Sequence, residues 1–131
     1  MVSRIDAINI TARDHESLGA FWQQLLALQE NPDNPNSPGD PVTVFLTEPV
    51  AVNFVFQPVA EGEEFEPRIH FDLNPVGSTR DEEVERLQEL GATVVADRRR
   101  ENGSGYVTMS DVDGNEFCIQ RSPEEVAAAG Y

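Results

Sequence analysis

The chain has 131 residues, the size of one ordinary domain or of two small halves that share a core. Acidic residues number 24 against nine basic ones, all arginine, and the net charge of −15 argues against nucleic acid and anionic membranes as partners. No apolar run approaches the roughly 20 residues that span a bilayer, and residues 1–4 show no apolar signal region. With a single cysteine, Cys118, we expect a cytoplasmic protein without disulfides.

The first predicted elements are a strand over 4–12 and a helix that begins at His15. Apolar and polar side chains alternate along the strand with a period of two. Asp14 is placed to cap the helix, because its carboxylate can accept from free N–H groups of the first turn. Helical spacing then puts five apolar side chains on one face, which we expect to be buried: Leu18, Phe21, Trp22, Leu25 and Leu26.

The rest of the first half is predicted as a loop, two strands and a linker. Residues 31–41 contain four prolines and three asparagines, a composition typical of a loop. The segments 42–47 and 52–57 are rich in β-branched and aromatic residues, as strands are. Four glutamates, a glycine and a proline in 60–67 indicate a connection between two halves.

The second half repeats this order. A strand over 68–73 is followed by a helix, for which Thr79 and Glu82 have the spacing of a capping box. Gly91 is placed to end that helix in a left-handed conformation. Val84, Leu87 and Leu90 line one helix face, and three strands follow over 93–96, 105–110 and 116–120, with a turn at 111–115. A last helix begins at Ser122 and Pro123.

The two halves also align in register, since Ala7 and His70 are 63 positions apart, as are Ile10 and Leu73. This similarity predicts a duplicated βαβββ unit. We expect an α+β fold in which two such modules form a curved mixed sheet, with the helices on its outer face and a cup on the other. The single domain 1–131 then divides into module one over 4–60, a linker over 61–67, module two over 68–121 and a C-terminal helix over 122–131.

Strand alternation sorts side chains between the two faces of this sheet. The apolar set, which we expect to face the helices, is Ile8, Ile10, Ile69, Phe71, Leu73, Phe117 and Ile119. The opposite face gathers Asn9, Arg68, His70, Asp72, Glu116, Cys118 and Gln120. Two interpretations of this polar face stay open: it meets solvent, as in many half-exposed sheets, or it lines a pocket.

Four segments are similar to a known superfamily: the strand and helix over 5–22, the strand 68–73, the helix end at 90–92 and above all 111–119. Through them the chain resembles the vicinal oxygen chelate superfamily, which comprises glyoxalases, bleomycin-resistance proteins and extradiol dioxygenases. The resemblance covers the chain to about Gln120 and is closest to small glyoxalase-like proteins. It implies the fold described above and a homodimer, because modules of relatives often pair across two chains.

The resemblance also implies where a metal would bind. Metal-using relatives take ligands from the first and the late strand of each module. The first-strand positions here are Ala7 and His70, and the late-strand positions are Phe54, with Gln57 less favoured, and Cys118. Two plausible ligands remain of four, and divalent catalytic sites generally have three protein ligands. We therefore expect no catalytic metal, although Glu116 could join His70 in holding one.

The leading hypothesis is metal-independent binding of a small organic molecule, a metabolite or an antibiotic, in the cup. Its candidate ligand-binding residues are His70, Asp72, Arg68, Asn9, Glu116, Cys118 and Gln57. The acidic surface favours a cationic or polyhydroxylated ligand. The alternatives are a divalent-metal-dependent lyase or dioxygenase-like enzyme and a non-catalytic interaction domain. By default Cys118 is an inert packed thiol, and the arginines at 98–100 form a solvated loop or a clamp for an anionic ligand group.

Overall fold

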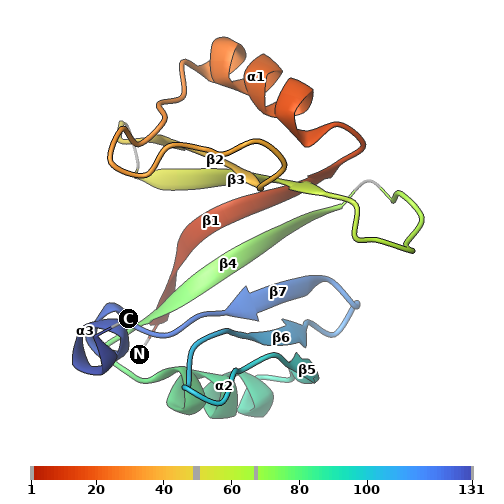
Figure 1. Ribbon diagram of the computed structural model, residues 1–131. Helices are drawn as coiled ribbons and strands as arrows, with labels where there is room; N and C mark the ends of the chain where they lie inside the picture. Colours follow the sequence, from red (N-terminus) through yellow and green to blue (C-terminus); the bar gives the residue numbers. More distant parts are fainter. Residues whose placement is uncertain (1, 49–50, 67, 131) are drawn as a thin grey trace. The chain divides into compact units, whose positions relative to one another are not determined.

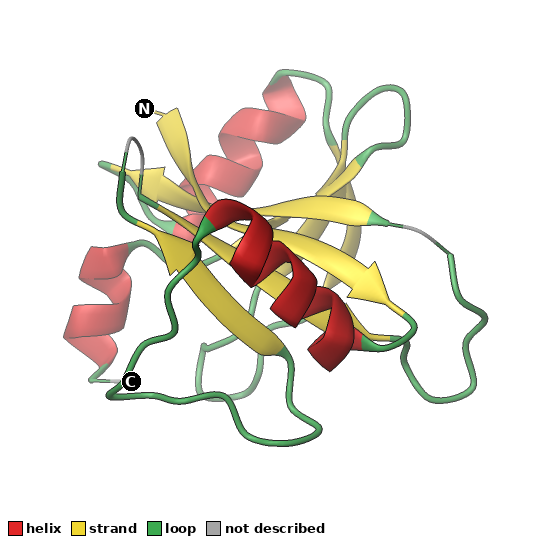
Figure 2. Ribbon diagram, turned by 90° about the horizontal axis from the view of Figure 1, so that it is seen from above, coloured by secondary structure: helices red, strands yellow, loops and turns green. Residues whose placement is uncertain are grey.

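The computed structural model describes residues 2–48, 51–66 and 68–130 as a mixed, open, seven-stranded sheet with three helices, an α+β fold (Figures 1 and 2). The elements are β1 (Val2–Ala12), α1 (His15–Leu26), β2 (Val42–Leu46), β3 (Val52–Pro58), β4 (Ile69–Val76), α2 (Arg80–Glu89), β5 (Thr93–Asp97), β6 (Val107–Ser110), β7 (Glu116–Ile119) and α3 (Pro123–Ala129). The predicted fold class is confirmed. None of the described helices is both long and apolar enough to span a membrane.

Two compact units divide the chain. Unit 1 contains the residues up to Asp6 together with those from His70 onward, and unit 2 contains Ala7–Ile69. The strand β1 contributes its first residues to unit 1 and its remainder to unit 2.

Unit 2 is built on β3, which pairs antiparallel with β2 and parallel with β1. Asp14 caps α1 by accepting a hydrogen bond from the Ser17 N–H, as predicted. The core consists of three buried residues, Leu28, Val44 and Phe56. One face of α1 packs against them through Leu18 and Trp22. Figure 1 shows α1 running alongside β2.

The predicted apolar face of α1 is narrower than expected. Phe21 and Leu26 are 59% and 38% exposed, so their predicted burial is wrong. Both lie on the borders of the stripe centred on Leu18 and Trp22, since each residue turns the helix by about 100°. Phe21 instead packs edge-on against the Trp22 ring, with 5.9 Å between the ring centroids.

The first module also differs from the predicted βαβββ order. Among the described residues of unit 2, two strands follow α1, whereas three strands follow α2 in unit 1. The segment between α1 and β2 makes one isolated bridge, Gln29 to Phe45. Its four prolines, at positions 32, 35, 38 and 41, cannot donate to a strand ladder, which explains why it stays a loop.

In unit 1, β7 pairs parallel with β4 and antiparallel with β6, which in turn pairs antiparallel with β5. Three buried residues form its core, Val107, Met109 and Ile119. Side chains of α2, β4 and β7 pack against this core: Val84 and Leu87, Leu73, and Phe117. The predicted orientations of Leu73, Phe117 and Ile119 toward the helix are confirmed.

Three other residues expected in apolar contacts are exposed instead: Leu90 by 70%, Ile69 by 65% and Phe71 by 44%. Leu90 is the C-cap of α2, beyond its last full turn, so it no longer faces the sheet. Among the β4 side chains that face this side, the core packed under α2 includes Leu73 but neither Ile69 nor Phe71. The helix contacts mainly β5 and β7, so it leaves this part of β4 uncovered.

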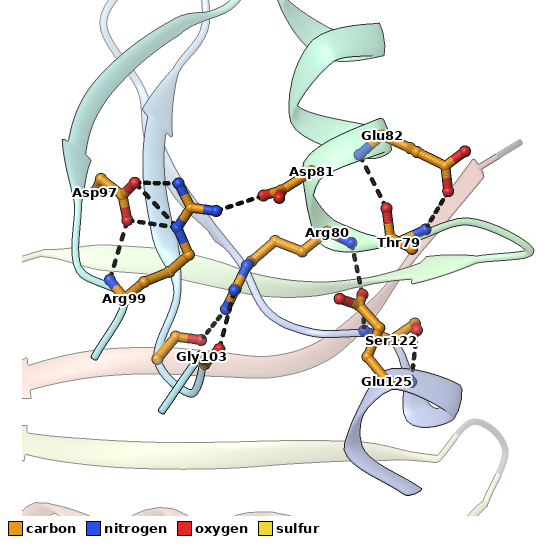
Figure 3. Close-up of polar contacts among 10 residues, drawn as sticks. Thr79, Arg80, Asp81, Glu82, Asp97, Arg99, Gly103, Ser122 and Glu125 are labelled. Atoms are coloured by element: carbon orange, nitrogen blue, oxygen red, sulfur yellow. Dashed lines mark hydrogen bonds and ion pairs between the residues drawn. The ribbon is translucent and has the colours of Figure 1, made fainter. Parts of the chain in front are cut away.

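The helix ends of unit 1 are tied together by polar contacts (Figure 3). The two predicted caps are confirmed, as Thr79–Glu82 and Ser122–Glu125 both form reciprocal capping boxes. The buried guanidinium of Arg80 donates to the carbonyls of Gly103 and Gly105, each at 3.0 Å, and its N–H donates to the carboxylate of Glu125. These bonds fix the loop that carries residues 98–105.

Candidate polar site on the unit 1 sheet

The strand register of unit 1 places polar side chains in a row on the face opposite the packed core. Asp72 on β4 is paired with Cys118 on β7, and Cys118 is paired with Thr108 on β6. His70 lies two residues before Asp72 and therefore on the same face. Ligand atoms of His70, Asp72 and Cys118 all lie within 4.8 Å of one another. Three of the seven predicted site residues are thus brought together.

Within this group, the contacts are loose. Nε2 of His70 is 3.7 Å from Oδ1 of Asp72, an ion-pair distance but longer than a hydrogen bond. The side chains of the two residues keep 25% and 18% of their surface exposed. Cys118 is buried, and its Sγ lies 3.6 Å from the Thr108 hydroxyl. His70 and Asp72 are therefore not joined by a direct hydrogen bond, and they lie on a face that is half open to solvent.

The charges around Cys118 act in both directions. Burial raises the pKa of its thiol, and the nearby charges of Asp72 and Glu116 raise it further. The Thr108 contact and the charge of Arg98 lower that pKa without reversing the shift. The thiol is therefore protonated at neutral pH, which agrees with the predicted inert, packed cysteine.

Asp6 of β1 belongs to the same neighbourhood. Burial raises the pKa of its carboxyl group, and repulsion from Asp72 adds to the shift, while Arg4 lowers it. Two carboxylates and one histidine thus share a poorly solvated region. A positively charged or hydrogen-bond-donating partner would be stabilised there.

Glu116 does not join the group of converging ligand atoms. It is exposed, and its influence on Cys118 is that of a nearby charge. The third residue of the group is Asp72. It is the partner of Cys118 in the β4–β7 pairing, so the two side chains lie next to each other. Glu116 thus lies outside the group formed by His70, Asp72 and Cys118, whose ligand atoms converge.

The other predicted site residues lie in unit 2. Asn9 is buried, and its Oδ1 accepts a hydrogen bond of 3.0 Å from the Gln57 side chain. Arg68 is exposed and forms an ion pair with Glu66 at 3.0 Å. Phe54, the favoured late-strand position, packs against the core under α1, so it faces away from Asn9 and Gln57.

Thr108 and Asp6 were not predicted as site residues. Thr108 reaches the group through its pairing with Cys118, and Asp6 interacts with it through the charge of Asp72. Periodicity along one strand does not determine which strands become neighbours. The alternation that places Glu116 and Cys118 on the polar face would have identified Thr108 only if the register between β6 and β7 had been known.

Residues 7–120 match the glyoxalase-like domain family. The chain belongs to this family. Glyoxalase-like proteins are part of the vicinal oxygen chelate superfamily, so the predicted relationship is confirmed. No curated protein sequence matches the chain.

Solved structures share the fold of this glyoxalase-like protein at low identity. Streptomyces coelicolor methylmalonyl-CoA epimerase (Q60A), in complex with 2-nitronate-propionyl-CoA, is 16% identical with a TM-score of 0.62, over 94% of this chain and 99% of that chain. The Mycobacterium tuberculosis epimerase is 17% identical with a TM-score of 0.60, over 95% and 91%. Hypothetical protein BH1468 of Bacillus halodurans C-125 is 16% identical with a TM-score of 0.57, over 92% and 96%.

Proposed function

We propose that this glyoxalase-like protein binds a small organic molecule on the unit 1 sheet face that carries His70, Asp72 and Cys118. The observation that carries the proposal is the convergence of three chemically different side chains on a face that is half open to solvent. Half-buried polar groups gain more from a ligand than fully exposed ones, because less water competes with the ligand. The Streptomyces coelicolor epimerase, which shares this fold, is in complex with 2-nitronate-propionyl-CoA, and this supports a small-molecule role here.

We place the protein in the cytoplasm as a homodimer, with a metabolite or an antibiotic as the ligand. The exposed apolar side chains of Ile69 and Phe71 support the dimer, because a second copy could cover them. Sedimentation at micromolar concentration tests it, and a single-chain mass would contradict it.

The binding proposal is tested by a thermal-shift screen with metabolites and antibiotics, followed by titration of the best compound. We expect His70→Ala and Asp72→Asn to weaken its binding by up to about tenfold each, the value of one good hydrogen bond. Glu85→Gln is the matched control, since Glu85 is an exposed residue of α2, which packs on the opposite side of the unit 1 sheet. A compound that binds equally well to all four proteins would place the site elsewhere.

The second candidate function is that of a divalent-metal enzyme. The full ligand set of the superfamily does not fit, because Ala7 and Phe54 cannot donate. His70, Asp72 and Cys118 nevertheless offer imidazole, carboxylate and thiolate within 4.8 Å, a set suited to zinc or iron(II). A bound ion would supply Lewis-acid polarisation of a ligand oxygen. Cys118 would have to lose its proton, which its buried surroundings oppose.

Elemental analysis of protein purified without chelator distinguishes the two candidates. Stoichiometric zinc, iron, nickel or manganese that is lost in both His70→Ala and Cys118→Ala would favour the enzyme. Metal-free protein that still binds a compound from the screen would favour simple binding. A metal retained by both variants would show that these residues do not hold it.

A further inference from the structure

A one-residue bulge in β5 decides on which face Arg98 lies. Val94 is paired with Met109 and packs against the unit 1 core. The pairing then skips Val95, so that Ala96 is the partner of Thr108. Because Thr108 faces Cys118, the residues of β5 that follow the bulge at even-numbered positions point toward the polar face.

The contacts of the neighbouring residues agree with this orientation. Asp97 is paired with the core residue Val107, and it binds Arg99, which also reaches Asp81 of α2 at 2.7 Å (Figure 3). These side chains therefore lie on the helix side of the sheet. Arg98 extends the strand by donating its N–H to the Tyr106 carbonyl at 2.9 Å, so its side chain points to the opposite side. Its charge acts on Cys118, as this placement requires.

The guanidinium of Arg98 is unlike those beside it. Arg99 binds Asp97 and Asp81, and Arg100 contacts the Ser104 hydroxyl. Among the residues that the structure describes, no carboxylate forms an ion pair with Arg98, although the chain has 24 acidic residues. Its planar set of donors is therefore available at the edge of the polar face.

We propose that Arg98 binds the anionic group of the ligand, so that the ligand is a small carboxylic acid whose carboxylate lies on the Cys118 side of the polar face. The proposal rests on the proposed function and adds the chemical class of the ligand. A guanidinium matches a carboxylate with two parallel hydrogen bonds. Asp6, Asp72 and Glu116 surround the rest of the face and repel an anion, so the carboxylate has one favourable position.

This inference departs from the expectation of a cationic ligand, while a polyhydroxylated carboxylic acid remains compatible with it. The acidic surface acts at long range, where salt screens charges beyond about 8 Å. A guanidinium in direct contact is screened far less, so it determines which group binds beside it. His70 and Asp72 remain available for the polar groups at the other end of the ligand.

Alkylation of Cys118 tests the placement of this positive charge without knowledge of the natural ligand. Iodoacetate and iodoacetamide have similar shapes, but only iodoacetate carries a carboxylate. Both consume the same thiolate, so the ratio of their rate constants does not depend on the thiol pKa. With EDTA present, Arg98→Gln should lower the iodoacetate-to-iodoacetamide ratio about three- to tenfold, the effect of one charge at short range near a surface.

Two variants control for net charge and for the guanidinium itself. Arg99→Gln removes the same charge from the opposite face and should leave the iodoacetate-to-iodoacetamide ratio unchanged. Arg98→Lys keeps the positive charge and should retain most of the ratio measured for the unaltered protein. An unchanged ratio in Arg98→Gln, or an equal fall in Arg99→Gln, would overturn the proposal. Failure of the compound screen would instead count against the proposed function, because the ratio does not depend on it.

If Cys118 resists both reagents, malonate and malonamide replace them, and the ring signals of His70 are followed by NMR. The chain has two histidines, so His70→Ala identifies the signals. Malonate should shift them in the unaltered protein and not in Arg98→Gln, while malonamide should have little effect. Malonate that leaves the unaltered protein unshifted, or that shifts both proteins equally, would overturn the proposal.

Discussion

The two faces of the unit 1 sheet carry similar polar groups and use them in opposite ways. On the helix side, Glu83 is fully buried and accepts from both Arg86 and Ser3, and Arg99 binds two carboxylates. On the other face, His70 and Asp72 stay 3.7 Å apart and Arg98 has no ion pair among the described residues. Groups in short hydrogen bonds hold the fold together, and groups in longer, partly solvated contacts can meet a ligand.

The comparison predicts that substitutions on the helix side lower stability, while substitutions on the polar face affect binding. The largest effect is expected for Arg80→Ala. It removes a buried guanidinium and leaves the carbonyls of Gly103 and Gly105 without their donor. We expect a loss of about 2–4 kcal/mol in the free energy of unfolding, measured by urea denaturation. A loss below about 0.5 kcal/mol would show that the 98–105 loop does not depend on Arg80.

A smaller loss is expected for Ser122→Ala, which removes the N-cap of α3. The Ser122 hydroxyl accepts from the Glu125 N–H, and the residue is buried. Removing such a cap costs about 1 kcal/mol. Ser37→Ala is the control, because Ser37 is exposed in the loop before β2. Equal urea midpoints for the two variants would contradict a stabilising role for this cap.

The ion pairs of Arg99 predict a response to acid. Hydrogen bonds from Arg99 lower the pKa of Asp97 from 3.8 to about 2. A lowered pKa in the folded state means that the stabilisation is fully present above pH 3.8 and is lost as the pH falls through 2. Asp97→Asn should therefore flatten the dependence of Tm on pH between about 4 and 2. The same slope in both proteins would exclude Asp97 as a source of acid sensitivity.

The smallest effect on stability is expected on the polar face. His70→Ala and Asp72→Asn should each change the free energy of unfolding by less than about 0.5 kcal/mol, because the contact between these two residues is long and partly solvated. Urea denaturation at pH 7 measures the change. A loss above about 1.5 kcal/mol would place these residues among the structural groups and remove the distinction between the faces.

Local signals in the sequence predicted local structure well. The caps at Asp14, Thr79 and Ser122 were correct, because a cap depends on residues within one helical turn. The burial of Phe21 and Phe71 was not, since it depends on how far each helix extends over its sheet. Burial is a property of neighbours distant in sequence, and periodicity gives only the direction in which a side chain points.

The site could be predicted in part for the same reason. Alternation placed His70, Asp72 and Cys118 on one face, and the structure brings them together. It could not show that Asp72 rather than Glu116 is the third member, because that choice depends on cross-strand register. Alternation also could not assign a face to Arg98, because the sequence of 93–97 does not indicate that Val95 is an extra residue in the pairing.

The bulge at Val95 also bears on how this protein could evolve. In an uninterrupted strand of the same sequence, Asp97 would take the place on the polar face that the bulge gives to Arg98. Either Asp97 or Arg98 can therefore occupy this position on the polar face. The number of residues that precede them in the strand determines which of the two does so. An insertion or deletion that shifts this strand by one residue could invert the charge presented to a ligand while both side chains are retained. Selectivity on this scaffold is therefore open to change through chain length as well as through substitution.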